Sequence, residues 1–353
     1  MIVMEASATA EQIAAVVDEI KSCGLKADIC RWDYQTVIGP IGDEKRLPFA
    51  LLETFPGVKE ARVTDMPYKL ISQEYSGFSG KDGHRRAIQI GKVVVGDDEP
   101  VFIAGPCAVE SQSQLFRIAE GVKKAGAHIL RGGVFKPRSS VHSFQGLGGE
   151  DWQKAEEVLK WLSDAGQQFD MPVITEVRGE AQLDLLAEYV DILQIGARNM
   201  YDQDLLAAAA RKKKPVLLKR HFGAGVEELL SLAEYIAAEG NKDIILCERG
   251  IVPVGKGKNY TRYMLDLAAV PVIKKETYLP VIVDPSHATG RRDLIFNMSC
   301  AAVAAGANGL MIEVHYDPGQ ALVDGKQMIT PEELKGVIAA CRNISELVAA
   351  KGS

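Results

Sequence analysis

The chain has 353 residues, of which 47% are hydrophobic and 25% are charged, and its formal net charge is −6. This composition supports a large folded core, argues against a disordered chain, and argues against nucleic acid as the main partner. No stretch is apolar enough to span a bilayer, no secretory leader is visible, and the six cysteines are scattered, so we expect a cytoplasmic protein with reduced thiols.

Residues 1–66 predict a small separate α+β unit. Residues 2–4 read as a strand, and Thr9 with Gln12 forms a capping box before a helix whose apolar residues recur at helical spacing. The remaining predicted elements are strands near residues 27–32 and 35–41, a helix near residues 44–54 and a strand near residues 58–63. The resulting order β-α-β-β-α-β predicts a ferredoxin-like sandwich, which occurs mostly in binding or regulatory modules.

Residues 67–99 are expected to form a linker and a hairpin between the two units. The stretch 76–83 is polar and rich in glycine, which is typical of a linker. Residues 88–95 predict a short hairpin that precedes the main domain.

Residues 100–353 predict one large main domain, because short apolar runs alternate there with helical segments. The runs are residues 101–104, 128–131, 172–176, 191–195, 215–219, 243–248, 280–284 and 309–313. About eight such βα units in about 250 residues predict an α/β fold of the (β/α)8 TIM barrel type. A doubly wound open sheet is the alternative, but no Gly-x-Gly-x-x-Gly turn follows the first run. Thr330, Pro331 and Glu333 predict the start of a last helix.

Residues 130–140, with the sequence LRGGVFKPRSS, follow the second apolar run and contain three cations and no acid. Adjacent glycines allow backbone N–H groups to approach an anion closely. Arginine offers a planar fork of donors for phosphate or carboxylate, and lysine offers a mobile point charge. We interpret the stretch as part of a pocket for a small, strongly anionic substrate; a solvated basic loop is the alternative.

Polar side chains recur where the predicted strands end, which is the edge that carries the active site of a barrel. The cations expected to meet there are Arg131, Lys136, Arg138, Arg198, Lys219 and Arg249. A partly buried cation without a partner costs roughly 3–5 kcal/mol, so we expect anionic ligands to neutralise several of them. Glu176, Glu248 and Asp284 are alternative internal partners.

A second group of candidates combines a thiol, an imidazole and two carboxylates, all at or beyond strand ends: Cys107, His287, Glu313 and Asp324. These donors suit a borderline divalent ion. The four come from separate loops, so their spacing does not establish a metal site, and Cys247 and His315 are rival ligands by position. A lone buried cysteine is also often just a small apolar residue.

Seven motifs, taken in order, resemble those of the 3-deoxy-D-arabino-heptulosonate 7-phosphate (DAHP) synthase family, in particular its type I beta branch. They are GPCAVES at 105–111, LRGGVFKPRSS at 130–140, SFQGLG at 143–148, IGARNM at 195–200, CERG at 247–250, DPSHATGRR at 284–292 and MIEVH at 311–315. The first unit, with TVIGPIGD at 36–43, resembles the ferredoxin-like regulatory domain that some members carry.

The resemblance implies a metal-dependent TIM barrel that condenses phosphoenolpyruvate with erythrose 4-phosphate and water, giving DAHP and phosphate in the first step of the shikimate pathway. It implies a divalent ion, Mn²⁺ or alternatively Fe²⁺, Co²⁺ or Zn²⁺, on Cys107, His287, Glu313 and Asp324. It implies phosphoenolpyruvate on Arg131, Lys136, Arg198, Lys219 and Arg249. It places Lys136, Arg138, Ser139 and Asp324 near erythrose 4-phosphate. Lys136, Glu176 and Arg131 are the expected catalytic residues, and by position either Glu176 or Lys136 handles the proton of the attacking water.

The resemblance further implies a homotetramer and feedback by tyrosine or phenylalanine through residues 1–66. The chain departs from the family pattern at His142, Tyr201 and His221, and at Pro40, which lacks an N–H donor. Two rival functions stay open at this point. One is 3-deoxy-manno-octulosonate 8-phosphate synthase, which performs the same chemistry on arabinose 5-phosphate, and the other is a non-catalytic sensor of aromatic amino acids.

Overall fold

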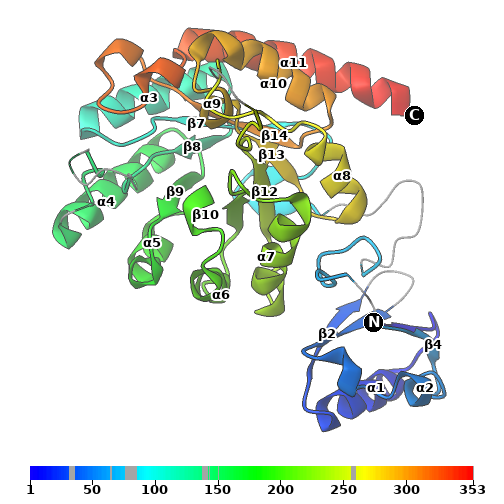
Figure 1. Ribbon diagram of the computed structural model, residues 1–353. Coiled ribbons are helices and arrows are strands. Elements are labelled where there is room, and N and C mark those ends of the chain that lie inside the picture. The colour runs from blue at the N-terminus through cyan, green and yellow to red at the C-terminus, as the bar shows by residue number, and fades with distance from the viewer. Residues whose placement is uncertain are drawn as a thin grey trace.

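Eight parallel strands close into a barrel in the computed structural model (Figure 1), which describes residues 1–31, 36–63, 66–75, 86–136, 142, 144–149, 151–255 and 260–352. The strands are β7 (Val101–Gly105), β8 (Ile129–Arg131), β9 (Val173–Val177), β10 (Ile192–Ile195), β11 (Val216–Lys219), β12 (Ile244–Glu248), β13 (Val281–Val283) and β14 (Gly309–Glu313). The barrel closes where β14 pairs in parallel with β7, from Gly309 opposite Val101 to Glu313 opposite Gly105. The predicted TIM barrel is therefore confirmed, and the open sheet is excluded.

Helices cover the outside of the barrel, and several of them begin at residues whose side chains cap the first turn, such as Ser111, Asp151 and Asp202. The helices are α3 (Gln112–Ala125), α4 (Trp152–Gln168), α5 (Leu183–Tyr189), α6 (Gln203–Arg211), α7 (Val226–Ala238), α8 (Ala269–Glu276), α10 (Ile295–Ala304) and α11 (Pro331–Gly352). The predicted capping box of α11 is present, because Thr330 N–H donates to Glu333 Oε2 at 2.7 Å and Glu333 N–H donates to Thr330 Oγ1 at 3.3 Å. Figure 1 shows α11 running beside α10 along one side of the barrel. Within the described residues, no helix is long and apolar enough to cross a membrane.

The interior of the barrel is filled by apolar side chains at the end opposite to the strand C-termini. The hairpin formed by β5 (Ile88–Ile90) and β6 (Val93–Val95) adds its own side chains to this cluster and covers that end. Cys247 belongs to the same apolar cluster and is fully buried. Within the described residues Cys247 does not belong to the cluster of metal donors, so it is not supported as a rival ligand.

The N-terminal unit is a four-stranded antiparallel sheet with helices on one face. Its strands β1 (Ile2–Met4), β2 (Lys26–Arg31), β3 (Thr36–Ile41) and β4 (Val58–Ala61) are ordered β2-β3-β1-β4, and α1 (Ala10–Ser22) packs on them. This is the predicted ferredoxin-like order. The expected helix at residues 44–54 is wrong in detail, since it consists of a 3-10 turn, η1 (Glu44–Arg46), and the short α2 (Phe49–Leu52). Pro48 separates them, because it lacks an N–H and favours an extended Leu47, whose ψ is 134°.

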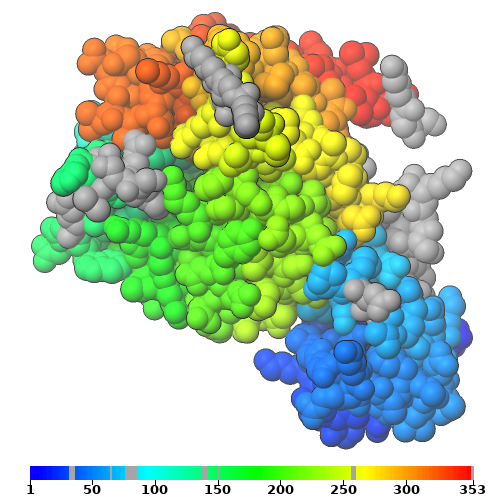
Figure 2. Space-filling model, viewed as in Figure 1, coloured from blue at the N-terminus to red at the C-terminus, as the bar shows by residue number. Residues whose placement is uncertain are grey.

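The segment between the two units is packed wherever the structure describes it. Leu70 and Ile71 are buried, and their N–H groups donate to Glu234 of α7 at 2.8 and 3.3 Å. Tyr75 is also buried and donates to the carbonyl oxygen of Asp28 on β2 at 3.0 Å, while Lys242 of the barrel pairs with the Asp28 carboxylate at 2.7 Å. Residues 66–75 therefore fasten the small unit to one side of the barrel (Figure 2), rather than acting as a free linker. The predicted glycine-rich stretch 76–83 lies outside the described residues.

Candidate active site

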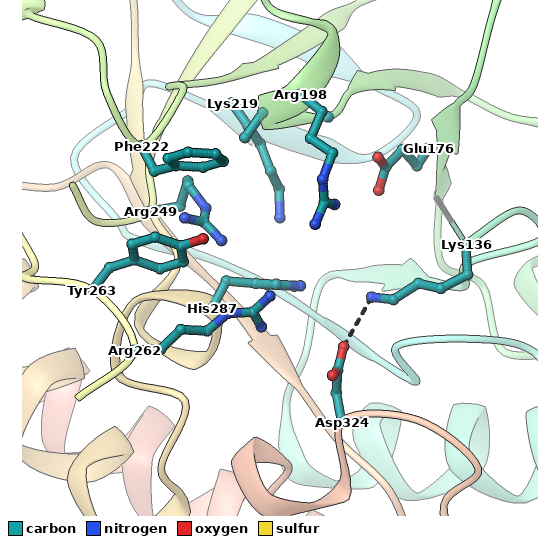
Figure 3. Close-up of a pocket in the computed structure, with 12 residues that line it drawn as sticks. Lys136, Glu176, Arg198, Lys219, Phe222, Arg249, Arg262, Tyr263, His287 and Asp324 are labelled. Carbon is teal, nitrogen blue, oxygen red and sulfur yellow. Dashed lines mark ion pairs between the residues drawn. The ribbon is translucent and has the colours of Figure 1, made fainter. Parts of the chain in front are cut away.

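A pocket opens at the C-terminal ends of the barrel strands (Figure 3), where the sequence predicted the active site. It is lined by Lys136, Glu176, Gly196, Ala197, Arg198, Lys219, Phe222, Arg249, Arg262, Tyr263, His287 and Asp324. Five of these residues are Lys or Arg and two are acids. A concave site with this excess of positive charge is suited to a ligand that carries several negative charges.

Several of the buried cations are paired with internal acids, as the sequence allowed. Lys219 Nζ lies 2.6 Å from Asp284 Oδ2, and Lys136 Nζ lies 3.1 Å from Asp324 Oδ2. Arg249 differs from them. It is 5% exposed, and its Nη1 is buried with no hydrogen-bond partner. Among the described residues it joins no ion pair, so its charge stays available to a ligand.

Two further arginines are buried in ion pairs and do not line the pocket. Arg220 donates to Glu248 at 2.8 Å and to Asp266 at 2.9 Å, which fixes the ends of β11 and β12. Arg131 donates to Glu313 Oε1 at 2.8 Å and approaches the carbonyl oxygen of Cys107 at 3.5 Å. In this structure Arg131 therefore supports the ends of β7 and β14, and its predicted contact with substrate stays a prediction.

The four predicted metal ligands come together beside the pocket. One donor atom from each of Cys107, His287, Glu313 and Asp324 lies within 4.8 Å of the other three. Cys107 Sγ lies 3.2 Å from Asp324 Oδ2, and His287 Nε2 lies 3.3 Å from Glu313 Oε1. A thiolate, an imidazole nitrogen and two carboxylate oxygens at this spacing can surround one divalent ion with small shifts of their side chains.

Neighbouring side chains orient the histidine and the glutamate of this cluster. Asp284 Oδ2 accepts a hydrogen bond from His287 Nδ1 at 2.7 Å, which turns Nε2 of the ring toward Glu313. Gln327 Nε2 donates to Glu313 Oε2 at 2.5 Å, and Glu313 N–H donates to Ser286 Oγ at 3.0 Å. Metal-binding histidines commonly have such a carboxylate partner on the other ring nitrogen, so the arrangement fits a metal centre.

The charges around the cluster determine its protonation. Burial alone would raise the pKa of Glu313, but His287, Arg131 and Lys136 lower it to about 2. For Asp284, His287 and Lys219 likewise outweigh burial and hold the pKa well below its ordinary value. Both carboxylates are therefore ionised at neutral pH. Burial, with the charge of Glu313, raises the pKa of the Cys107 thiol well above its ordinary value, and Lys136 and Arg131 oppose this shift only in part.

Asp324 reaches the cluster from a loop, eleven positions after the last residue of β14. Its backbone adopts the left-handed conformation with φ of 54°, which a residue other than glycine rarely takes. Its carbonyl oxygen accepts from Gln327 N–H at 3.0 Å, so the same short turn, η6 (Gly325–Gln327), also supplies the amide that binds Glu313. A strained position of this kind is commonly found at functional sites.

The adjacent glycines Gly132 and Gly133 both take part in packing within the barrel. Gly132 N–H donates to Ile174 O at 3.1 Å within the barrel, so it is not available to an anion. A Cβ on Gly133 would lie 2.2 Å from the carbonyl oxygen of Cys107. This glycine therefore allows the loop after β8 to pack against the residue that supplies the sulfur ligand. Arg138 and Ser139, with Pro137, lie outside the described residues, and their predicted roles stay predictions.

Substitution Gly133→Ala is expected to lower the free energy of unfolding by roughly 1–3 kcal/mol, because the added methyl group overlaps the backbone of Cys107. It should also weaken binding of Mn²⁺, because Cys107 must move. Urea unfolding and Mn²⁺ titration measure the two effects. Gly336→Ala on α11 is the matched control, since a Cβ at that position would have no atom within 4 Å, and it should be neutral or stabilising. Equal behaviour of the two variants would contradict the packing role of Gly133.

Glu176 lies at the end of β9 and faces the pocket. Its Oε2 accepts a hydrogen bond from Gln194 Nε2 at 3.2 Å, which holds the carboxylate in one orientation. Gly196 makes room for it, because a Cβ at that position would lie 2.0 Å from Glu176 Oε1. The carboxylate is thus held among the pocket cations but joins no ion pair with them in the part of the chain that the structure describes, which suits a group that accepts a proton.

Sequence reasoning missed several residues of the site and misjudged one. Arg262 and Tyr263 line the pocket but lie in the long segment between β12 and α8, far from any strand end. Gln327 likewise comes from the loop after β14. His315 is a rival metal ligand by sequence position, but within the described residues it does not belong to the donor cluster, and its Nδ1 accepts from Asp317 N–H at 3.0 Å.

Comparisons with known proteins agree with this architecture. Residues 73–349 match the model of the DAHP synthetase I family, and residues 1–64 match the DAHP synthase ferredoxin-like domain. A phospho-2-dehydro-3-deoxyheptonate aldolase of Thermotoga maritima is 42% identical over 351 residues, which cover 99% of each chain. A 2-dehydro-3-deoxyphosphooctonate aldolase of Syntrophobacter fumaroxidans is 31% identical over 72% of this chain and 90% of its own.

Two solved structures are similar to this chain. The crystal structure of the Thermotoga maritima DAHP synthase has a TM-score of 0.73 and 43% identity, and the match covers 99% of this chain and 97% of that one. A truncated form of the Thermotoga maritima enzyme matches 81% of this chain and 98% of its own, with a TM-score of 0.69 and 41% identity. The similarity to the full-length structure thus includes both the barrel and the small unit.

Proposed function

The chain belongs to the DAHP synthetase I family, and we propose that the pocket at its barrel mouth binds phosphoenolpyruvate and erythrose 4-phosphate beside one metal ion. The activity of the chain is the condensation of these two substrates with water to DAHP and inorganic phosphate, the first step of the shikimate pathway. The observation that carries the assignment of the site is the meeting of four metal donors within 4.8 Å at the edge of a pocket lined by cations.

The family is metal-dependent, and the donor set of this chain fits a divalent ion. We propose that Cys107, His287, Glu313 and Asp324 hold Mn²⁺, with Fe²⁺, Co²⁺ and Zn²⁺ as alternatives, because the mixture of sulfur, nitrogen and oxygen donors suits ions of borderline softness. When bound, the ion would supply Lewis acidity for the aldehyde oxygen of erythrose 4-phosphate. Asp284 and Gln327 would keep the histidine and the glutamate in their binding orientations.

Phosphoenolpyruvate places a carboxylate and a phosphate in one small volume. The cations proposed to bind them are Lys136, Arg198, Lys219 and Arg249, which line the pocket, and Arg131, which lies at its edge in contact with Cys107 and Glu313. Charge-assisted hydrogen bonds contribute roughly 1.5–3 kcal/mol each, so four or five of them could supply tight binding. Arg249 joins no ion pair among the described residues and its buried Nη1 has no hydrogen-bond partner, and we propose that it contacts the ligand directly.

The chemistry assigned to this pocket balances as follows. C3 of phosphoenolpyruvate forms a bond with the aldehyde carbon, and the aldehyde oxygen takes up one proton and becomes a hydroxyl. Water adds at C2 and gives up one proton, which balances the proton taken up by the aldehyde oxygen. The bond between C2 and the phosphate oxygen then breaks, the C2 hydroxyl loses its proton as the carbonyl forms, and the leaving inorganic phosphate takes up that proton. We propose that Glu176 accepts the proton of the attacking water, with Lys136 as the alternative group, because both line the pocket.

The choice of aldose is the sharpest test of the proposed substrate. Steady-state phosphate release should show a higher kcat/KM with erythrose 4-phosphate than with arabinose 5-phosphate, by about 10²-fold or more. The 2-dehydro-3-deoxyphosphooctonate aldolase of Syntrophobacter fumaroxidans matches less of this chain and is less similar to it than the Thermotoga maritima enzyme. Equal or greater turnover of arabinose 5-phosphate would overturn the choice. Failure of both aldoses to release phosphate would favour the non-catalytic sensor.

We propose that residues 1–66 form a regulatory unit that binds tyrosine or phenylalanine. Deleting residues 1–66 should abolish inhibition by both amino acids and leave kcat largely unchanged, because the metal donors and the pocket all lie in the barrel. The solved truncated relative, which matches 81% of this chain, supports the expectation that a barrel without this unit can fold. Inhibition curves of both forms, with thermal melting to confirm folding, measure the result. A truncated enzyme that stays fully sensitive would assign the unit another role.

A homotetramer and a cytoplasmic location complete the proposal. All six cysteines are free thiols, which fits a reducing compartment. Sedimentation velocity at several concentrations would determine the subunit number. A species smaller than a tetramer across the whole concentration range would contradict the proposed assembly.

A further inference from the structure

The pocket contains an arginine whose described neighbour is an aromatic ring rather than an acid. The Cζ atom of Arg249 lies 4.3 Å from the centre of the Tyr263 ring, and that of Arg262 lies 5.6 Å from the same ring. Figure 3 shows the guanidinium of Arg249 beside the rings of Tyr263 and Phe222 and directed into the pocket. The buried Nη1 of Arg249 has no hydrogen-bond partner. Something other than an ion pair among the described residues must hold this guanidinium in place.

Main-chain contacts fix the position of Tyr263. Its N–H donates to Ala288 O at 2.7 Å, and the N–H of Arg262 donates to Thr289 O at 2.9 Å, which ties this segment to α9 (Pro285–Thr289), the short helix that carries His287. Gly250 leaves the space that the ring needs, because its φ is +91° and a Cβ there would lie 2.7 Å from Tyr263 Cβ. The ring is therefore held by the backbone around it, independently of Arg249.

Further rings pack on Tyr263. Phe222 stacks on it with centroids 5.4 Å apart and an interplanar angle of 19°. His221 packs on Phe222 at 4.0 Å, and Tyr201 packs edge-on against His221 at 5.2 Å. Two of the positions that depart from the family pattern, His221 and Tyr201, thus continue an aromatic stack that runs from the surface to the pocket. The stack joins the loops after β10, β11 and β12.

An aromatic ring and a carboxylate can each hold a guanidinium in place, but they differ in how much of its positive charge remains available to a ligand. A carboxylate would neutralise Arg249 and compete with an anionic ligand for its donors. The face of an aromatic ring attracts the cation through its quadrupole but leaves the N–H groups and nearly all of the charge available. For Lys219, by contrast, Asp284 already occupies one donor at 2.6 Å. An arginine held by a ring is thus suited to receive the charge of a substrate.

We propose that Tyr263 is a positioning residue that holds the Arg249 guanidinium in place for one anionic group of phosphoenolpyruvate. The inference deepens the proposed function, since it rests on the assignment of Arg249 to phosphoenolpyruvate. A desolvated contact between a cation and a ring is worth enough to change affinity by about tenfold to thirtyfold. The effect should fall on KM for phosphoenolpyruvate and leave KM for erythrose 4-phosphate nearly unchanged.

Steady-state kinetics of Tyr263→Leu, Tyr263→Phe, Arg249→Ala and the double variant test the proposal. Tyr263→Leu should raise KM for phosphoenolpyruvate about tenfold, and Tyr263→Phe, which keeps the ring, should restore it. In the Arg249→Ala background the leucine substitution should have no further effect, because the partner is gone. Tyr260→Leu is the matched control. Tyr260 lies in the same segment as Tyr263 but is 73% exposed, so loss of its ring should leave KM for phosphoenolpyruvate unchanged.

A graded measurement separates the cation contact from a purely structural role. Phenylalanine with one, two and three ring fluorines, introduced at position 263, weakens the negative face of the ring while nearly preserving its shape. KM for phosphoenolpyruvate should rise with each fluorine, and thermal melting should stay constant. A flat series, or equal effects of Tyr263→Leu with and without Arg249, would overturn the positioning role. If Arg249→Ala itself left KM for phosphoenolpyruvate unchanged, the assignment of Arg249 in the proposed function would fail instead.

Discussion

Substitution His287→Ala is expected to lower kcat at least about 10³-fold and to remove tight binding of Mn²⁺. His287 supplies the nitrogen donor of the cluster, and its Nε2 lies 3.3 Å from Glu313 Oε1. Without the ring, Asp284 and Glu313 face one another across a site that lacks one of its four donors. Metal content after dialysis, Mn²⁺ titration and phosphate release measure the loss.

Two further substitutions should have smaller effects on metal binding than His287→Ala. Asp284→Asn keeps the shape of the residue that orients His287 but removes its charge, so it should weaken Mn²⁺ binding by about 10–100-fold, less than the loss of the ligand itself. Cys107→Ser replaces a soft donor by a hard one and should shift preference away from Zn²⁺ toward Mn²⁺.

The matched control for the cysteine is Cys247→Ser. Cys247 is fully buried inside the barrel and is a rival ligand by sequence position, so its substitution should affect stability but not the affinity for Mn²⁺. Unchanged Mn²⁺ affinity in His287→Ala would show that the ion binds elsewhere. Loss of affinity in Cys247→Ser, with the fold intact, would contradict the choice of sulfur ligand.

The barrel and much of its mouth were predictable because the relevant signals are local. Each strand is an apolar run that ends in a polar residue, as at Arg131, Glu176 and Glu248, and the barrel topology places all such ends on one rim. Asp324 was different. It comes from a loop well beyond β14, so its position relative to a strand end is a weak signal, and the family resemblance added its implied role as a metal ligand.

Other features depend on contacts between distant segments, which no local pattern reveals. Leu70 and Ile71 are ordered by Glu234, more than 160 positions away, so a stretch expected to be a linker is packed against α7. Tyr263 reaches the pocket because Ala288 accepts its N–H. Gly133 was noticed as a glycine that permits a close approach, and the structure places the backbone of Cys107 against it. A glycine that admits an anion and one that admits a neighbouring backbone have the same sequence signature.

Substitution Glu176→Gln should lower kcat about 10²–10⁴-fold while changing KM for phosphoenolpyruvate and the affinity for Mn²⁺ only slightly. Glutamine keeps the shape of the side chain and can still bond to Gln194, but it cannot accept a proton. Figure 3 shows Glu176 on the same side of the pocket as Arg198 and away from Asp324, so the change should not reach the metal donors.

Lys136→Met removes a positive charge beside the metal donors, so its effects can be compared with those of Glu176→Gln, which removes a proton acceptor. Lys136 Nζ lies 2.5 Å from Cys107 Sγ and 3.1 Å from Asp324 Oδ2, so its loss should weaken Mn²⁺ binding and raise KM for phosphoenolpyruvate, and Lys136→Arg should restore part of the binding.

Activity of Glu176→Ala should recover when formate is added, because a small carboxylate can occupy the vacated space and accept the proton. The contrary outcome is that Glu176→Gln keeps most of its kcat and Glu176→Ala shows no response to formate. Together these results would show that another group accepts the proton of the attacking water, and Lys136 would be the remaining candidate.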